Sequence, residues 1–250
     1  MKIKNILVSQ PQPSDLEKSP YTELVKKFNV NVAYRKFIRI EGVPAKEFRK
    51  DRINILDYTA VIFTSRNAVD HFFRICKEMR VEVPDTMKYF SISESTAYYL
   101  QKYVQYRKRK VFHSKESFAN LAELTRKHKT EKFLLPCSDV HKQEISNMLD
   151  ENKIQYKKAI IYRTLASDLS DIKIEDYDML VFFSPSGIKS LFKNFPKFKQ
   201  NTTAIGAFGS STAKAVTDAG LKLTVSAPSK TAPSMIMAIE QYLQNELKKK

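Results

Sequence analysis

Short turns rich in hydroxyl groups recur along the chain, each directly after an apolar stretch and before an amphipathic one. They are Thr64–Asn67, Ser93–Thr96, Ser184–Gly187 and Gly209–Thr212. Ser, Thr and Asn at such positions cap the first turn of a helix, and capping alone explains each turn taken singly. The same turns also present unpaired backbone N–H groups at the positive end of a helix dipole, which is a setting that binds carboxylate or phosphate.

The charge of the chain favours an anionic partner. Its 250 residues include 43 Lys and Arg against 27 Asp and Glu, which gives a formal net charge of +16. Such a field attracts anions and speeds their arrival. Nucleic acid, an anionic membrane surface and a small polyanionic substrate would each satisfy it. Four hydroxyl-rich turns in a chain of this charge indicate binding of anionic groups.

Several standard sites have no counterpart in the sequence. There are only five glycines, with no Walker loop and no GxGxxG, so we do not expect a bound nucleotide. No GxSxG or Ser-His-Asp signature is present. The histidines and cysteines show no metal-ligand spacing, so we expect no metal and interpret each histidine as a surface or helix-face residue. They are His71, His113, His128, His141, Cys76 and Cys137.

The strongest sign of nucleic-acid binding is the run RKRK at 107–110, which follows Tyr103 and Tyr106. Aromatic and basic residues together could stack on bases and contact phosphates. The run directly precedes the predicted strand VFH, which favours a solvated loop or a sheet edge. No nucleic-acid-binding motif supports the alternative, so a nucleic-acid partner is not our expectation.

Membrane and export signals are also missing from the sequence. No run approaches about 18 apolar residues, so we predict no membrane span. The start MKIKNILVSQPQP has too short an apolar run for a signal peptide and is interpreted as a first strand. Two cysteines without paired spacing indicate free thiols in a reducing cytoplasm.

Short Val-, Ile-, Phe- and Tyr-rich runs alternate with longer amphipathic stretches, which predicts an α/β fold with parallel sheets. One segment is repeated: DYTAVIFTSRNAVDHFF (57–73) returns as DYDMLVFFSPSGIKSLF (176–192). SESTAYYL (93–100) matches GSSTAKAV (209–216), and HSKESFANLAEL (113–124) matches PSKTAPSMIMAI (228–239). Core patterning does not fix polar turn residues, so we interpret the repeat as a duplication. Ten strands are expected, near 3–8, 30–35, 60–64, 88–92, 109–112, 131–135, 155–160, 178–183, 203–207 and 222–225.

The order of the repeats predicts two similar domains, each a five-stranded parallel sheet flanked by helices. Residues 40–160 form an inserted domain, and 1–35 plus 166–250 form a discontinuous one. The two-segment linker is 36–39 and 161–165. Two crossings indicate a hinged pair with a ligand cleft. Thr64–Asn67 and Ser184–Gly187 are expected to face each other across that cleft.

Four stretches carry a resemblance to a known family: VIFTSRNAV, VFFSPSGIKSLF, GSSTAKAVTDAGL and AIIYRT. With them, the whole chain resembles the uroporphyrinogen-III synthase family. The resemblance implies a cofactor-free lyase of tetrapyrrole and heme biosynthesis. Its reaction closes hydroxymethylbilane with loss of water and inverts ring D through a spiro intermediate. A catalytically silent relative that binds tetrapyrroles or other polycarboxylates is the first alternative, and a basic nucleic-acid-binding protein is the second.

The resemblance also assigns roles to residues. It marks Tyr162, in AIIYRT, as the hydrogen-bond donor or acid that helps hydroxide depart, although a tyrosine there could simply close a strand and pack. Together with the turns, it marks a set of residues for the substrate's carboxylates. They are Thr64, Ser65, Arg66, Asn67, Ser93, Thr96, Ser184, Ser186, Gly187, Gly209, Ser211, Thr212 and Lys230.

The chain departs from the family pattern at two positions. Gln10 stands where an Arg often follows the first strand, and Ser93 where Gly is usual. A missing Arg removes a strong carboxylate partner. Arg35, Arg66 and Arg163 are the candidates to replace it. The expected partner is a linear tetrapyrrole polycarboxylate, with transient contact to the enzyme that precedes it in the pathway.

Overall fold

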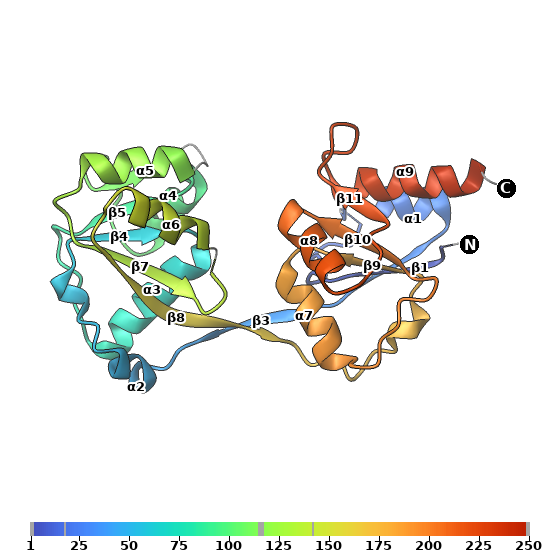
Figure 1. Ribbon diagram of the computed structural model, residues 1–250, viewed down its shortest axis with the longest axis horizontal. Coiled ribbons are helices and arrows are strands. Elements are labelled where there is room, and N and C mark those ends of the chain that lie inside the picture. Colours follow the sequence, from blue (N-terminus) through green and yellow to red (C-terminus); the bar gives the residue numbers. More distant parts are fainter. Residues whose placement is uncertain (1–2, 18, 115–117, 142, 249–250) are drawn as a thin grey trace. The chain divides into compact units, whose positions relative to one another are not determined.

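The computed structural model describes residues 3–17, 19–114, 118–141 and 143–248. The chain divides into two compact units, Ile40–Thr164 and Met1–Arg39 with Leu165–Lys250. It therefore passes from one unit to the other twice. In both units, helices pack on the two faces of a sheet (Figure 1).

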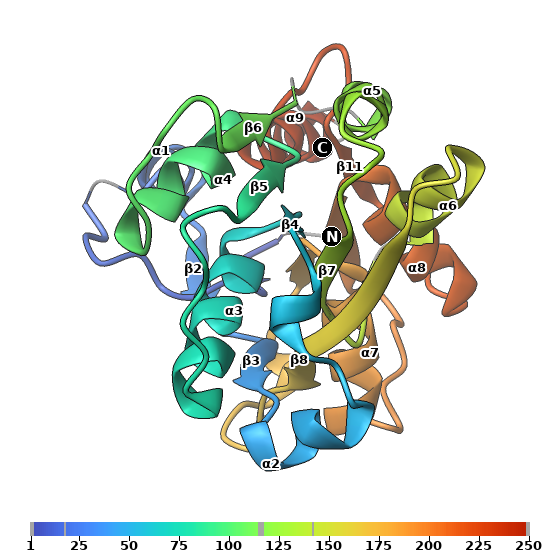
Figure 2. The same ribbon diagram turned by 90° about the vertical axis from the view of Figure 1, so that its left-hand side faces the viewer.

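The unit of residues 40–164 is built on a six-stranded sheet with the order β3-β8-β7-β4-β5-β6. The pairs β4/β5, β4/β7, β5/β6 and β7/β8 are parallel. Figure 2 shows these strands from the side of this unit. The strands are β3 (Ile38–Gly42), β4 (Ala60–Phe63), β5 (Lys88–Ser91), β6 (Val111–His113), β7 (Phe133–Ser138) and β8 (Tyr156–Ala166).

Alternation along the strands gives this sheet two apolar faces. Phe63 of β4 packs with Phe72 of α3 on one face, whereas its neighbour Ile62 packs with Leu121 of α5 on the other. Both faces of a parallel sheet are covered in this way. The first face carries α2 (Ala45–Phe48), α3 (Arg66–Met79) and α4 (Glu94–Tyr99), and the second carries α5 (Phe118–Lys127) and α6 (Gln143–Glu151). Three 3₁₀ turns, η1 (Arg49–Asp51), η2 (Ile55–Asp57) and η3 (Leu100–Lys102), complete the unit.

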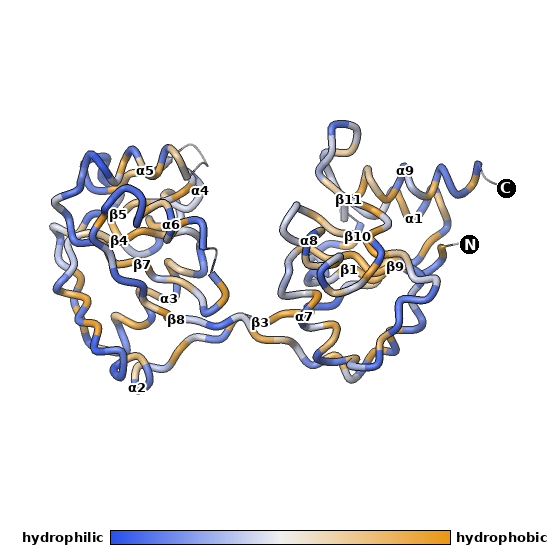
Figure 3. Tube along the Cα trace, in the orientation of Figure 1, coloured by the Kyte–Doolittle hydropathy of each residue, from blue (hydrophilic) through white to orange (hydrophobic). Residues whose placement is uncertain are grey.

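The other unit has a five-stranded sheet of order β11-β10-β9-β1-β2, in which all pairs are parallel. Hydrophobic residues run along its central strands (Figure 3). The strands are β1 (Asn5–Val8), β2 (Asn31–Tyr34), β9 (Met179–Phe182), β10 (Ala204–Phe208) and β11 (Val225–Ala227). One face packs against α1 (Thr22–Phe28) and α9 (Met235–Lys248). The other packs against η4 (Ile174–Asp176), α7 (Pro185–Asn194) and α8 (Ser210–Asp218).

Strand β3 is the element that the sequence did not predict. It lies where a linker was expected, and it raises the sheet of residues 40–164 from the expected five strands to six. The backbone N–H of Val43 donates to Ile161 O, and that of Ser167 donates to Phe37 O, so β3 and β8 run in opposite directions. Both segments at which the chain crosses between the units therefore lie in or beside paired strands rather than irregular chain.

Two further features bear on the class of protein. Cys76 and Cys137 are both buried free thiols. In the described ranges, no helix combines the length and the apolar character required to cross a bilayer.

Candidate functional site

A pocket of about 220 Å³ opens at the carboxyl ends of β4 and β7 in the residue 40–164 unit, beside Tyr162 of β8. Carboxyl ends of neighbouring parallel strands meet at one edge of a sheet, which is where ligands bind in open α/β folds. The polar lining comes from Thr64 and Ser65 after β4, from Ser138 at the end of β7 and from Tyr162 of β8. The walls are apolar, formed by Ile92, Leu135, Val140 and Ile145.

Tyr162 is a buried polar group of this pocket. Only 7% of its surface is exposed, and its hydroxyl lies 3.3 Å from Ser65 Oγ. Burial raises the pKa of the Tyr162 phenol, and the hydrogen bond with Ser65 partly opposes the rise. The phenol therefore stays protonated at neutral pH and can act as a proton donor. Its ring stacks on His71 with centroids 5.1 Å apart and planes inclined by 19°.

Ser65 serves helix α3 as well as the pocket. Its backbone is extended, and Ser65 Oγ accepts a hydrogen bond from Ala68 N at 3.2 Å, as an N-cap does. Arg66 and Asn67, the next two residues, are exposed on the first turn of the helix. The structure thus brings Thr64, Ser65 and Tyr162 into one pocket, with Arg66 and Asn67 following them on the surface.

The second predicted turn of this unit serves mainly its own helix. Ser93 Oγ accepts from Thr96 N at 3.3 Å and pairs with Thr96 Oγ1 at 3.0 Å. Thr96 is only 4% exposed, so both its hydroxyl and its N–H are used inside the unit. Helix α4 has six residues, which makes it a short dipole. Ser93 therefore caps α4, and Thr96 is the residue that donates to the cap.

In the other unit, Ser184 reproduces the geometry of Ser65. Ser184 Oγ accepts from Gly187 N at 3.2 Å and caps α7. Pro185 follows as the first helical residue and has no N–H, so this turn offers one donor fewer than the turn at Ser65. Ser186 is half-buried, and a Cβ at the buried Gly187 would come within 3.2 Å of the Phe182 ring.

Helix α8 begins without a side-chain cap. Its N-cap is Gly209, whose φ of 87° lies in the region that favours glycine. Thr212 is 1% exposed, and its N–H donates to Gly209 O. Ser211 is exposed on the first turn. Lys230 is exposed in the segment after β11, and its partner in the predicted repeat, Lys115, lies outside the described residues.

The three arginines that could take the place of the family Arg missing at Gln10 differ in their ion pairs. Arg35 forms an ion pair with Asp171, and Arg163 forms one with Glu47. The pKa of Glu47 is lowered chiefly by its hydrogen bond from Arg163. Arg66 has no carboxylate partner in the described part of the chain, and its guanidinium lies 5.5 Å from the Tyr99 ring. Of the three, Arg66 is the one open to a carboxylate ligand.

The tyrosines next to the basic run 107–110 are already used inside the protein. Tyr103 stacks on Phe73 at 4.5 Å and donates to Asp70 Oδ1 at 2.5 Å. Tyr106 stacks on Tyr98 at 5.7 Å. Each ring therefore has one face covered, which weakens the interpretation of this segment as a base-stacking platform.

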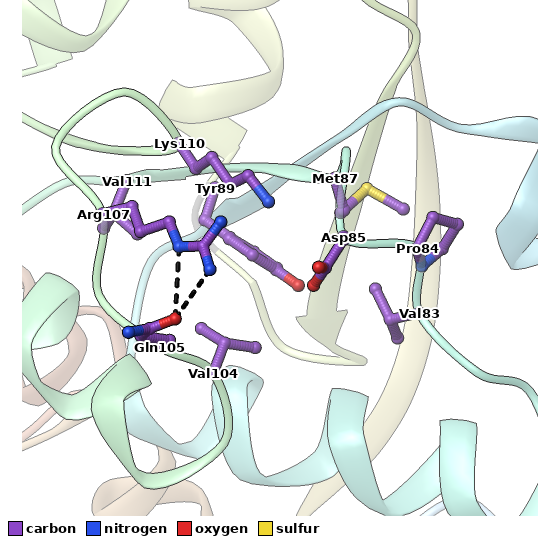
Figure 4. A pocket seen from close by; sticks show the side chains of 10 residues that line it. All are labelled: Val83, Pro84, Asp85, Met87, Tyr89, Val104, Gln105, Arg107, Lys110 and Val111. Carbon is purple, nitrogen blue, oxygen red and sulfur yellow. Dashed lines mark hydrogen bonds between the residues drawn. The ribbon is translucent and has the colours of Figure 1, made fainter.

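The same basic run contributes to a second, smaller pocket of about 70 Å³ (Figure 4). Arg107 and Lys110 line it together with Asp85 and the Tyr89 hydroxyl. Arg107 donates to Gln105 Oε1 from two nitrogens, at 2.8 and 3.2 Å. The lining residues precede β5 and β6 or begin them, so this pocket lies at the end of the sheet opposite to Tyr162.

Sequence reasoning missed three residues around the candidate site. Ser138 and His141 line the pocket, and His71 stacks on Tyr162. The His141 Nδ1 lies 3.1 Å from Ser138 O, and its buried Nε2 has no hydrogen-bond partner among the described residues. For His71, the only sequence signal was its spacing from Arg74 and Glu78 along one helical stripe.

The family profile described as uroporphyrinogen-III synthase HemD matches residues 19–237. Among curated proteins, no sequence matches the chain significantly. The chain is similar in fold to the solved uroporphyrinogen-III synthetase from Helicobacter pylori, with 18% identity and a TM-score of 0.59 over 97% of this chain and 100% of that one.

A solved mutant uroporphyrinogen III synthase from Thermus thermophilus is similar to the same extent. It shares 16% identity, with a TM-score of 0.57 over 97% of this chain and 99% of that one. These likenesses establish the α/β fold with parallel sheets flanked by helices. The profile covers most of the sequence, including the turn at Ser65, Tyr162 and the turns at Ser184 and Gly209. The chain therefore belongs to the uroporphyrinogen-III synthase family.

Proposed function

We propose that this chain closes hydroxymethylbilane to uroporphyrinogen III in tetrapyrrole biosynthesis, with Tyr162 as the proton donor. The observation that carries the proposal is the Tyr162 hydroxyl, which is buried and paired with Ser65 inside a pocket of a family member. Loss of the substrate's terminal hydroxyl needs a proton at the departing oxygen. A buried phenol beside that oxygen supplies one.

Ser65 assists Tyr162 in its role as proton donor. Because Ser65 Oγ accepts from Ala68 N, its own proton can be given to the Tyr162 oxygen. The phenol proton is then free for the departing hydroxyl. Ser65 also stabilises the phenolate that forms, which agrees with the direction of its effect on the Tyr162 pKa. The proton returns to the phenolate when the closing ring loses one, so the step is balanced by net loss of water.

The carboxylates of the substrate are assigned to the helix N-termini. Within the described residues, Asn67 N on α3 and Ser211 N on α8 make no hydrogen bond, so both are available to an anion. Arg66 adds a guanidinium that has no ion-pair partner there. Of the remaining candidates, Thr64, Ser186 and Lys230 are not buried and do not cap a helix. Hydrogen bonds to charged groups are the stronger kind, so a few of them suffice to hold a substrate with many carboxylates.

We further propose that the helix-starting turns of each unit bind carboxylates of the linear tetrapyrrole. Only a chain folded back on itself can undergo the inverted closure, so much of the catalysis is orientation. The paired turns differ as two unlike substrate ends require, with Arg66 and Asn67 in one and Pro185 and Ser186 in the other. A substrate that closes spontaneously also favours transient contact with the enzyme that makes it. Free thiols favour a cytoplasmic location.

The test is an isomer assay. The protein is incubated with hydroxymethylbilane released by the preceding enzyme, and the oxidised products are separated into isomers I and III. An excess of isomer III supports the synthase. Isomer I alone, formed at the rate of the uncatalysed reaction, contradicts it. In that case, tight binding of the linear substrate would leave the silent binding relative as the function.

A further inference from the structure

The guanidinium of Arg74 gathers four acceptors at the side of the sheet next to Tyr162. Its Nη2 donates to Val43 O at 2.9 Å and to Ile161 O at 3.0 Å. Its Nε donates to His71 Nδ1 at 3.0 Å, and its Nη1 donates to Glu78 at 2.5 Å. One side chain thus ties helix α3 to the peptide that precedes Tyr162 and to the segment after β3.

His71 links Arg74 to the phenol ring of Tyr162. Because Nδ1 accepts from Arg74, the proton of the neutral imidazole is on Nε2. Burial lowers the pKa of His71, and the neighbouring Arg74 lowers it further, so the ring is neutral at pH 7. The orientation fixed by Arg74 is the one in which the imidazole lies 5.1 Å from the Tyr162 ring and nearly parallel to it.

Gly42 gives the guanidinium its space. A Cβ at Gly42 would lie 2.7 Å from both Cζ and Nε of Arg74, which is closer than Cβ contacts in folded proteins. Any other residue at this position would push the guanidinium away from its acceptors. Glu78 holds the opposite side, since its Oε2 also accepts from Ala45 N at 3.1 Å.

We propose that Arg74 and His71 are positioning residues for Tyr162, holding its phenol against Ser65 from the side away from the pocket. This rests on the proposed function only in so far as Tyr162 is the proton donor. Neither side chain lines the pocket, so neither is expected to contact substrate. The substrate in question remains a linear tetrapyrrole whose terminal hydroxyl must approach one oriented phenol.

The first test is spectroscopic and needs no activity. The protein is labelled with carbon-13 tyrosine, and the Tyr162 signal among the 12 tyrosines is identified by its loss in Tyr162→Phe. His71→Ala removes the stacked ring, so the Tyr162 ring signal should shift. His71→Phe keeps an aromatic face and should leave the signal closer to its original position. A Tyr162 signal that is unmoved in His71→Ala overturns the proposal.

The second test is kinetic. His71→Ala should lower kcat for isomer III by about 10-fold to 100-fold with little change in KM, because misplacement of a reacting group costs rate rather than binding. His71→Phe should recover most of that loss. Equal losses in both variants, or a loss confined to KM, would show that the imidazole does not position the phenol.

Gly42→Ala tests Arg74 without touching either side chain of the stack. In the wild-type background it should lower kcat as Arg74→Ala does. In an Arg74→Ala background it should add almost nothing, because the group that the new methyl would displace is gone. Additive losses would overturn the role of Arg74. If the wild-type protein forms isomer I alone, the proposed function fails, while the tyrosine signal still decides the positioning.

Discussion

The hydroxyl of Tyr162 lies 3.3 Å from Ser65 Oγ, and the same Ser65 oxygen accepts the Ala68 N–H that begins helix α3. One oxygen therefore belongs to a helix cap and to the candidate proton donor. The cap fixes the serine, and the serine fixes the phenol. Because Ser65 has both roles, suitable substitutions at Ser65 and Tyr162 can distinguish effects on stability from effects on catalysis.

Tyr162→Phe should slow formation of isomer III by about 100-fold, the usual scale of a lost general acid. The fold should persist, because only one long hydrogen bond disappears and a buried hydroxyl leaves with it, a change of about 1 kcal/mol or less in the free energy of unfolding. The measurement is the initial rate of isomer III at saturating substrate, together with urea unfolding.

Tyr156→Phe is the matched control. Tyr156 lies on the same strand, β8, and donates to Ser146 O at 3.4 Å, away from the pocket. It loses the same atom without touching the candidate site, so its rate should equal that of the wild type. Similar rates in the two variants would remove Tyr162 from the mechanism.

Substitutions at Ser65 should distinguish its role as the cap of α3 from its role in catalysis. Ser65→Ala loses the cap of α3 and should destabilise the protein by about 1 kcal/mol. Ser65→Asp keeps an acceptor for Ala68 N and should retain most of the stability. Its carboxylate, however, would repel the substrate's carboxylates beside Tyr162, so it should be the slower enzyme of the two.

Ser184 provides the comparison for stability. It caps α7 with the same geometry, so Ser184→Ala should cost about as much as Ser65→Ala, near 1 kcal/mol. Thermal or urea unfolding measures both variants. If Ser65→Asp were as active as the wild type, Ser65 would have no role beyond its cap.

The turns were predictable from sequence because local chemistry fixes them. Ser65, Ser93 and Ser184 cap the helices that follow them, as small hydroxylated residues between strand and helix do. Strand β3 was not predictable. It is five residues long, with Arg39 and Glu41 at exposed positions, and it exists because β8 pairs with it from far along the chain. No local pattern carries that information.

The surroundings of Tyr162 were beyond sequence reasoning for the same reason. AIIYRT indicated the residue, but its stacking on His71 joins positions 91 residues apart. By sequence, Arg35, Arg66 and Arg163 were equivalent candidates, and the ion pairs of Arg35 and Arg163 distinguish them from Arg66. Tertiary packing also buries Thr96 and Thr212, which were expected as ligands, in the first turns of their helices.

Alkaline pH should destabilise the fold through the buried thiols. Burial raises the pKa of Cys76 to about 12 and that of Cys137 to about 11. In the unfolded chain a thiol loses its proton near pH 8.5. Between these values the folded state binds more protons than the unfolded state, so stability falls as pH rises, by up to about 1.4 kcal/mol per pH unit for each thiol.

Urea unfolding under reducing conditions at pH 8, 9 and 10 would measure the slope, since these values bracket the pKa of a free thiol, near 8.5. Cys137→Ala should remove the contribution of one thiol, so the free energy of unfolding should fall less steeply with pH, whatever the substitution does to stability at pH 7. An unchanged slope in that variant would mean that Cys137 has an ordinary pKa in the folded protein.

Arg66→Gln should raise KM for hydroxymethylbilane by about 10-fold with a smaller change in kcat, because a charge-assisted hydrogen bond to a carboxylate is worth roughly 1.5–3 kcal/mol at most. Arg66 qualifies because Arg35 and Arg163 are held by Asp171 and Glu47. Lys77→Gln, at the other end of α3, removes the same charge from the same helix and controls for the general field of a +16 protein.

Arg163→Gln should act differently, lowering stability through the loss of its pair with Glu47 while KM stays near the wild-type value. If Lys77→Gln raised KM as much as Arg66→Gln, the substrate would be attracted by net charge, and no single guanidinium would replace the arginine missing at Gln10.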